Sequence, residues 1–196
     1  PRNQDMTAPL LAEDVARLCG QKERLGGTLD NGSTYPQIRY LARGYAATSE
    51  GRYGDGARGG IDYLLDAQYD NGGWPQYWPL GLEVEIPRNS GHNPRDLSHF
   101  ITLNDNAMAG VLDLLLDVSR GADEFAFVDA ERPRRADEAV HRAVPLLVDL
   151  QVMVDGRRTA WAAQYDEQTL EPRWGRKFEP VSLAGNESVG IVRFLM

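Results

Sequence analysis

The segment "YLLDAQYDNGGWPQY" (residues 63–77) decides the fold, because a second part of the chain repeats its pattern. Residues 146–151 read "LLVDLQ", and residues 158–165 read "RTAWAAQY". Both segments have a Leu-Leu pair, a glutamine near the end of a predicted helix, and then a tryptophan and a Gln-Tyr pair in the following loop. In this alignment Trp74 corresponds to Trp161, and Gln76 corresponds to Gln164. A recurring helix and loop indicates repeated helical hairpins, which form a solenoid when open and a toroid when they close on themselves.

Hydrophobic periodicity predicts helices in the rest of the chain as well. Apolar residues recur at steps of three and four over residues 10–18, 35–49, 57–67, 104–121 and 137–151. Asn104 or Asp105 stands where an N-cap belongs, and Gly121 where a C-terminal glycine belongs. The glycine-rich residues 49–56 predict a break, and Pro145 predicts a kink or a later helix start. Strand signals are short and weak, in residues 76–80, 156–165 and 189–195.

These patterns predict a single all-α domain over residues 1–196. We expect an α/α toroid of antiparallel helix pairs with a few short strands. The final residues, "SVGIVRFLM", stay apolar to the end without a cap, so we expect the toroid to be incomplete at its C-terminal end. Loops that follow equivalent helices gather on one face of such a fold, where a site is most easily built.

Composition excludes several classes of function. The chain has 196 residues, of which 42% are apolar, and no stretch approaches the roughly 20 apolar residues of a membrane span. Its formal charge of −8 argues against a nucleic-acid partner. The single cysteine, Cys19, cannot form an internal disulfide. The chain contains neither a P-loop nor an H-E-x-x-H motif.

Three groups of polar and aromatic residues have both a structural and a functional interpretation. In "NDNAM", residues 104–108, capping needs one polar residue of the three, whereas a calcium site would use their carboxylate and amide oxygens. Asp166 is read from local sequence as a turn aspartate. In the loop of the first repeat, Gln68, Gly72, Gly73 and Trp74 favour a structural role. Gln76, Tyr77 and Trp78 favour contact with sugar rings. Residues 81–100 form a long polar loop, which is typical of functional or disordered segments.

Five segments together resemble the pectate lyases of polysaccharide lyase family 10. They are "DNGSTYPQIRYLAR", "DYLLDAQYDNGGWPQYWPL", "ITLNDNAMAGVLDLLLDV", "AWAAQYDEQTLEP" and "ESVGIVRFLM". The resemblance implies an α/α toroid that cleaves polygalacturonate by β-elimination with calcium. Residues 81–100 are longer than the usual link in this family, and its C-terminal segment is absent from this sequence.

The resemblance also implies roles for particular residues. Asp105 and Asp166 match two acidic residues of the calcium and substrate centre, and Asn106 matches a neighbouring site residue. The family uses an arginine as its base, for which Arg176 and Arg193 are the candidates in this chain and a residue beyond Met196 is the alternative. Lys177 is a further candidate for substrate binding. The resemblance implies a secreted or periplasmic protein, which we expect to be a monomer.

Two other functions stay open at this stage. A member of this family that lacks the base would bind pectic polymers without cleaving them. The pattern Q-x-x-x-G-x-W, from Gln68 to Trp74, also occurs in terpenoid cyclases, which are α/α toroids as well. Those enzymes use an acidic Asp-x-Asp-Asp motif and an aromatic cavity, whereas this chain has no such motif and only 9% aromatic residues. We therefore expect a polar groove rather than a deep apolar pocket.

Overall fold

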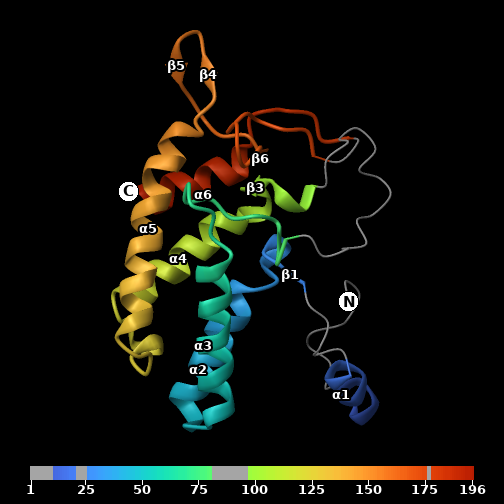
Figure 1. Ribbon diagram of the computed structural model, residues 1–196, viewed down its shortest axis with the longest axis vertical. Helices are drawn as coiled ribbons and strands as arrows, with labels where there is room; N and C mark the ends of the chain where they lie inside the picture. Colours follow the sequence, from blue (N-terminus) through green and yellow to red (C-terminus); the bar gives the residue numbers. More distant parts are fainter. Residues whose placement is uncertain (1–10, 21–25, 81–96, 176–177) are drawn as a thin grey trace.

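The structure is a computed structural model, which describes residues 11–20, 26–80, 97–175 and 178–196. Two helical hairpins and one further helix make up most of the described part (Figure 1). Helix α2 (Tyr35–Thr48) packs along α3 (Gly51–Asp66), and α4 (Ala107–Ser119) packs along α5 (Glu131–Asp149). Helix α6 (Gly185–Leu195) contacts α4, and α1 (Ala12–Cys19) buries none of its residues.

The predicted all-α class of helix pairs with few strands is confirmed. Short 3-10 helices are η1 (Asp30–Gly32), η2 (Leu97–His99), η3 (Asn104–Asn106) and η4 (Asp123–Phe125). The strands have two residues each: β1 (Gly27–Thr28), β2 (Tyr77–Trp78), β3 (Ile101–Thr102), β4 (Met153–Val154), β5 (Arg157–Arg158) and β6 (Gln164–Tyr165). Helix α4 contacts both α2 and α6, as expected for an arc of a toroid. None of the helices in the described ranges is long and apolar enough to cross a membrane.

Each hairpin has its own antiparallel ladder, in which a two-residue strand before the first helix pairs with a two-residue strand after the second helix. Strand β1 pairs with β2, with Gly27 opposite Trp78, and β3 pairs with β6, with Ile101 opposite Tyr165. The ladders make Tyr77 the structural equivalent of Gln164. The expected match of Gln76 with Gln164 is therefore wrong by one residue. Strand pairing fixes which residues are equivalent in the two loops, whereas an alignment of the loop sequences alone does not.

The match between Trp74 and Trp161 is confirmed by two hydrogen bonds that recur in both hairpins. Each indole N–H donates over 2.7 Å to a backbone carbonyl of the preceding helix, Leu64 or Leu147. Each tryptophan carbonyl accepts the backbone N–H of the next unit, from Thr102 at 3.1 Å and from Ala184 at 2.7 Å. The two tryptophans thus close their own hairpin and attach the following one.

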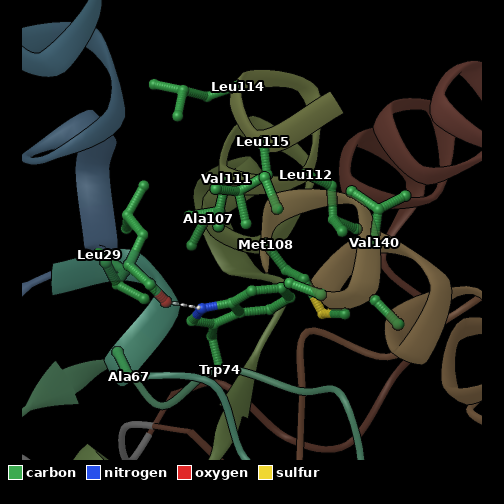
Figure 2. Close-up of a cluster of buried hydrophobic side chains, with 14 of the residues drawn as sticks. Leu29, Ala67, Trp74, Ala107, Met108, Val111, Leu112, Leu114, Leu115 and Val140 are labelled. Carbon is green, nitrogen blue, oxygen red and sulfur yellow. Dashed lines mark hydrogen bonds between the residues drawn. The ribbon is translucent and has the colours of Figure 1, made fainter. Parts of the chain in front are cut away.

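Trp74 lies in the middle of the hydrophobic core (Figure 2). Its side chain is 1% exposed, and apolar residues from both hairpins surround it, among them Leu29, Ala67, Met108, Val111, Leu112 and Val140. The core is therefore shared between the hairpins, which explains why short ladders are enough to align them.

The predicted structural role of Gln68 and the Gly72-Gly73 pair is confirmed. The amide nitrogen of Gln68 donates to the carbonyls of Gly72 (3.1 Å) and Ala139 (2.8 Å), so it attaches this loop to α5. Gly72 has φ = 95°, and a Cβ there would overlap the backbone of Arg142. Only glycine combines that dihedral angle with so close an approach to another helix.

Two predictions about helix boundaries are wrong. The predicted break at residues 49–56 is confined to Ser49 and Glu50, and residues 51–56 form the first turns of α3. Glycines there allow close packing on α2, since a Cβ on Gly54 would lie 2.9 Å from the ring of Tyr45. Residues 189–195 belong to α6 rather than to a strand, since Ser188 and Ile191 face the core. Helix α5 begins at Glu131 and contains Pro145 within it, so the proline does not set its start.

Replacing Gly72 by alanine tests the close approach of the loop to α5. We expect Gly72→Ala to lower the free energy of unfolding by about 2 to 4 kcal/mol, because backbone strain and overlap with a backbone add together. Gly121→Ala is the matched control, since Gly121 also has positive φ (64°) but a Cβ there would meet nothing within 4 Å. That control should lose only about 1 kcal/mol. Equal losses in urea unfolding would show that Gly72 contributes only its dihedral angle.

Candidate active site

The candidate site lies where the first turns of α2, α4 and α6 meet. The 3-10 helix η3 leads into α4 and contacts η1, which leads into α2, and it also contacts α6. In Figure 1 β3 and β6 lie beside the start of α6, at the same end of the helices. The repeat predicted that the loops after equivalent helices gather on one face; the segments that meet here are those that open the helices.

The backbone of η3 adopts an uncommon conformation that its sequence makes possible. Asp105 (φ 51°, ψ 30°) and Asn106 (φ 57°, ψ 27°) are both left-handed. The first hairpin repeats the arrangement at Asn31 (φ 54°, ψ 31°) and Gly32 (φ 61°). Aspartate, asparagine and glycine are the residues that tolerate this region, and such residues cluster at functional sites.

The prediction that Asn104 or Asp105 caps α4 is wrong. The N-cap residue is Asn106, and no side chain forms a cap hydrogen bond there. Asn104 instead donates from its amide nitrogen to Asp105 Oδ2 over 3.1 Å. Capping therefore does not explain three polar residues in a row at this position.

Asn106 carries a buried oxygen that has no donor. Its Oδ1 atom has no hydrogen-bond partner among the described residues. Gly190 of α6 gives this side chain its space, because a Cβ on Gly190 would overlap Oδ1. A buried acceptor without a donor or cation destabilises a protein by about 1 to 3 kcal/mol. The atom is thus suited to a bound group that supplies positive charge.

Glu187 belongs to the site, although the sequence analysis missed it. It lies in the first turn of α6, and its Oε1 accepts the backbone N–H of Asp105 over 3.3 Å. The residues that follow it were interpreted as a strand, which hid its position at the start of a helix. The helical period of residues 188, 191 and 194 was the pattern that would have revealed it.

Asp166 is fully buried, and four hydrogen bonds from residues within 168–173 reach its carboxylate. Its Oδ1 accepts the N–H groups of Gln168 (3.0 Å) and Thr169 (2.9 Å), while its Oδ2 accepts Nε (3.2 Å) and Nη2 (2.9 Å) of Arg173. The backbone N–H of Thr169, then that of Gln168 and the guanidinium of Arg173, lower the pKa of Asp166 to about 2. These contacts are those of a turn aspartate, so a calcium role for Asp166 stays a prediction that requires Arg173 to release it.

Asp105 and Asp166 flank opposite ends of one ladder. Asp166 follows Tyr165, which pairs with Ile101, whereas Asp105 lies beyond Thr102 at the other end of β3. Convergence of the two acids on one ion therefore stays a prediction, whereas the Glu187 side chain does contact the Asp105 turn.

The oxygen atoms at the start of α4 and α6 have the chemistry that calcium prefers. Calcium takes about six to eight oxygens from carboxylates and amides without strict geometry. Asp105, Asn106 and Glu187 supply two carboxylates and one amide oxygen that lacks a donor. In the described ranges, no three acidic, histidine or cysteine side chains form a ready-made cluster for a metal ion. These three residues thus fit calcium as part of a ligand set that substrate oxygens would complete.

The residues predicted to face sugar lie beside the first hairpin. Gln76 donates from its amide nitrogen to Oδ2 of the buried Asp30 over 3.0 Å, and its carbonyl accepts the N–H of Leu29. Trp78 packs partly against the core, and its carbonyl accepts the hydroxyl of Tyr63 over 3.1 Å. Tyr77 is half-buried next to them. Each has a structural contact or partial burial, and sugar contact stays a prediction.

The basic candidates are not brought to Asp105 by the described structure. Arg193 is exposed in the last turn of α6, whereas Glu187 lies in the first turn of that helix. Arg193 thus lies at the opposite end of α6 from the Asp105 turn. Arg176 and Lys177 lie outside the described residues.

Hairpins of helices joined by short ladders, with polar turns gathered at one end, define an all-α repeat protein of the α/α type. The family model described as pectic acid lyase matches residues 1–196, so the chain belongs to the pectic acid lyase family.

Two solved structures of a family 10 polysaccharide lyase from Cellvibrio cellulosa are similar to this chain. One is the lyase itself, and the other is a mutant in complex with trigalacturonic acid. Each is 29% identical with a TM-score of 0.78, and each comparison covers 88% of this chain and 50% of the lyase. This chain thus spans about half the length of those lyases. Among curated proteins, none matches it.

The low pKa of Asp166 predicts how stability depends on pH. Because folding lowers this pKa from near 4 to about 2, the bonds of Asp166 stabilise the fold above pH 4 and are lost as the pH falls through 2. Asp166→Asn should lower the free energy of unfolding at pH 7 by about 1 to 2 kcal/mol, since Arg173 is 35% exposed and partly screened. The difference from wild type should shrink between pH 4 and pH 2.

Asp149→Asn provides the control, because Asp149 pairs with Arg158 on the surface, where both side chains are about half exposed or more. Its effect should stay under about 0.5 kcal/mol at every pH. An Asp166→Asn protein as stable as wild type at pH 7 would contradict the structural role of this carboxylate.

Proposed function

We propose that this protein is a pectate lyase, which cleaves α-1,4-polygalacturonate by β-elimination with calcium as cofactor. The observation that carries the proposal is the match of the pectic acid lyase family to the whole chain. The complex of a similar lyase with trigalacturonic acid supports the same class of substrate. The polar turn at Asp105, at the junction of three helices, supplies a site for it.

The reaction needs an acidified C–H bond and a base. In a galacturonate unit the C5 hydrogen lies next to the C6 carboxylate, so its removal places negative charge on that carboxylate. A base takes the C5 proton, the electron pair forms the C4–C5 double bond, and the C4 glycosidic oxygen leaves with the bonding electrons. When bound, calcium supplies a Lewis acid that stabilises the charge on the carboxylate.

The residues at the start of α4 and α6 would hold the cation and orient the sugar. Asp105 and Glu187 contribute negative charge, and Asn106 contributes the buried amide oxygen without a donor. The Glu187 carboxylate accepts the N–H of Asp105, which attaches this turn to the start of α6. A cation bound between carboxylates of the protein and carboxylates of polygalacturonate would also explain how a chain of charge −8 binds an acidic polymer.

The base is the part of the proposal that rests on the family resemblance alone. An arginine has a pKa above about 12, so it acts as a base only in a desolvated position with cationic neighbours. The exposed Arg193 does not meet that condition, which leaves Arg176 or a residue outside this sequence. A protein that meets its substrate in plant cell walls would be secreted or periplasmic.

The first test follows the unsaturated product. The protein is mixed with polygalacturonate, and the absorbance of the 4,5-unsaturated ends in the ultraviolet is recorded with calcium and with a chelator. We expect product only with calcium. Product formation that a chelator leaves unchanged would reject the calcium role. Binding of polygalacturonate without any product would instead indicate a non-catalytic pectin-binding protein.

The second test removes the charge of Asp105. Asp105→Asn is suited to this purpose, since asparagine tolerates the left-handed backbone at this position. We expect kcat/KM to fall about 100-fold, which corresponds to about 2.7 kcal/mol of transition-state stabilisation. Calcium affinity, measured by calorimetry without substrate, should fall as well. Asp55→Asn, an exposed site on α3, should match wild type in both measurements. Wild-type values for Asp105→Asn would remove this site.

A further inference from the structure

Tyr35 reaches from the first hairpin into the second beside the candidate site. It is the first residue of α2, directly after the η1 turn. A Cβ on Gly110 of α4 would lie only 2.5 Å from Cε1 and 2.6 Å from Cε2 of the Tyr35 ring. The tip of the ring thus rests on Gly110, one helical turn beyond Asn106. The absence of a side chain at Gly110 is what admits the ring.

The hydroxyl of Tyr35 lies between the first turns of two helices. A Cβ on Gly32 would stand 3.6 Å from this hydroxyl, which places it at η1, while the ring tip lies on α4. Burial, followed by the charges of Asp113 and Asp105, raises the pKa of Tyr35. The hydroxyl therefore stays protonated at neutral pH and remains a hydrogen-bond donor.

Three other tyrosines that are buried or half-buried near the ladders use their hydroxyls within the fold, whereas the hydroxyls of Tyr35 and of the half-buried Tyr77 have no hydrogen-bond partner among the described residues. Tyr63 donates to Trp78 O (3.1 Å), Tyr69 donates to His99 O (2.8 Å), and Tyr165 Oη accepts the N–H of Ala162 (2.6 Å). The hydroxyl of Tyr35 makes no hydrogen bond to any residue that the structure describes. Because Tyr35 is half-buried and its hydroxyl is not one of the buried atoms without a partner, this donor is accessible to a ligand.

We infer that Tyr35 is a substrate-binding residue, whose hydroxyl donates to an oxygen of the galacturonate unit on the first-hairpin side of Asp105. The inference rests on the proposed function and extends it to a second sugar. Glu187 lies on the α6 side of Asp105 and Tyr35 on the α2 side. A polymer bound at Asp105 would therefore run along the row η1, η3 and α6. The Tyr35 hydroxyl is a neutral donor, so the acceptor on the galacturonate unit is a hydroxyl oxygen or a carboxylate oxygen.

Tyr35→Phe separates binding from packing, since phenylalanine keeps the ring on Gly110 and removes only the hydroxyl. Tyr40→Phe is the matched control, because Tyr40 lies on the same helix and is 74% exposed. Affinity for trigalacturonic acid is measured by calorimetry at saturating calcium, together with the melting temperature and the affinity for calcium alone. We expect Tyr35→Phe to weaken trigalacturonic acid binding about tenfold, as for loss of one hydrogen bond to a polar ligand. Melting temperature and calcium affinity should stay at wild-type values, and Tyr40→Phe should match wild type throughout.

A second variant moves the ring instead of truncating it. Gly110→Ala places a methyl group where the ring tip lies, so it should weaken trigalacturonic acid binding to a similar degree while calcium affinity stays unchanged.

Three outcomes would overturn the inference. These are wild-type trigalacturonic acid affinity in Tyr35→Phe, wild-type affinity in Gly110→Ala, and an equal loss of calcium affinity in Tyr35→Phe without sugar. If the wild-type protein itself binds no trigalacturonic acid, the proposed function fails together with the inference. A failure confined to the Tyr35 variants leaves the proposed function intact.

Discussion

The bond between each loop tryptophan and the next repeat is the constraint on which the rest of the structure depends. The carbonyl of Trp74 accepts the N–H of Thr102, and the carbonyl of Trp161 accepts the N–H of Ala184, while both indoles bond to the helix before them. Because the same residue closes one unit and attaches the next, the starts of α2, α4 and α6 lie in a row. Without that row, η1, η3 and the first turn of α6 would not meet.

Because these turns meet, polar residues in one unit are held or buried by residues of the next unit. Asp105 lies in a left-handed turn whose N–H is held by Glu187 from another unit. The side chain of Asn106 fits against Gly190, which leaves one oxygen buried and without a donor. Tyr35 crosses to Gly110 in the same way from the other side. In both cases a glycine on the neighbouring helix, Gly190 or Gly110, provides the space for the side chain. The candidate site therefore depends on glycines that have no side chain to contact a ligand.

Some of this arrangement follows from local patterns and some does not. The repeat around Trp74 and Trp161 was readable because both tryptophans follow a helix of clear period. The start of α3 was misread because glycines that allow close helix packing look, in sequence, like glycines that break a helix. The start of α6 was misread because valine and isoleucine favour strands in isolation, whereas here Ser188 and Ile191 are buried on a helix that packs against α4. Glu187 was lost with that helix.

The amino-acid sequence by itself determined the helical class, the paired repeat, and the structural role of Gln68 and Trp74. These conclusions rest on periodicity and on motifs, which are local properties of the chain. Only the tertiary structure decided that Asp166 is bound by Arg173, that Glu187 joins Asp105, and that the ring of Tyr35 rests on Gly110. The partners of a polar side chain come from segments far away in the chain, and packing alone sets which segments meet.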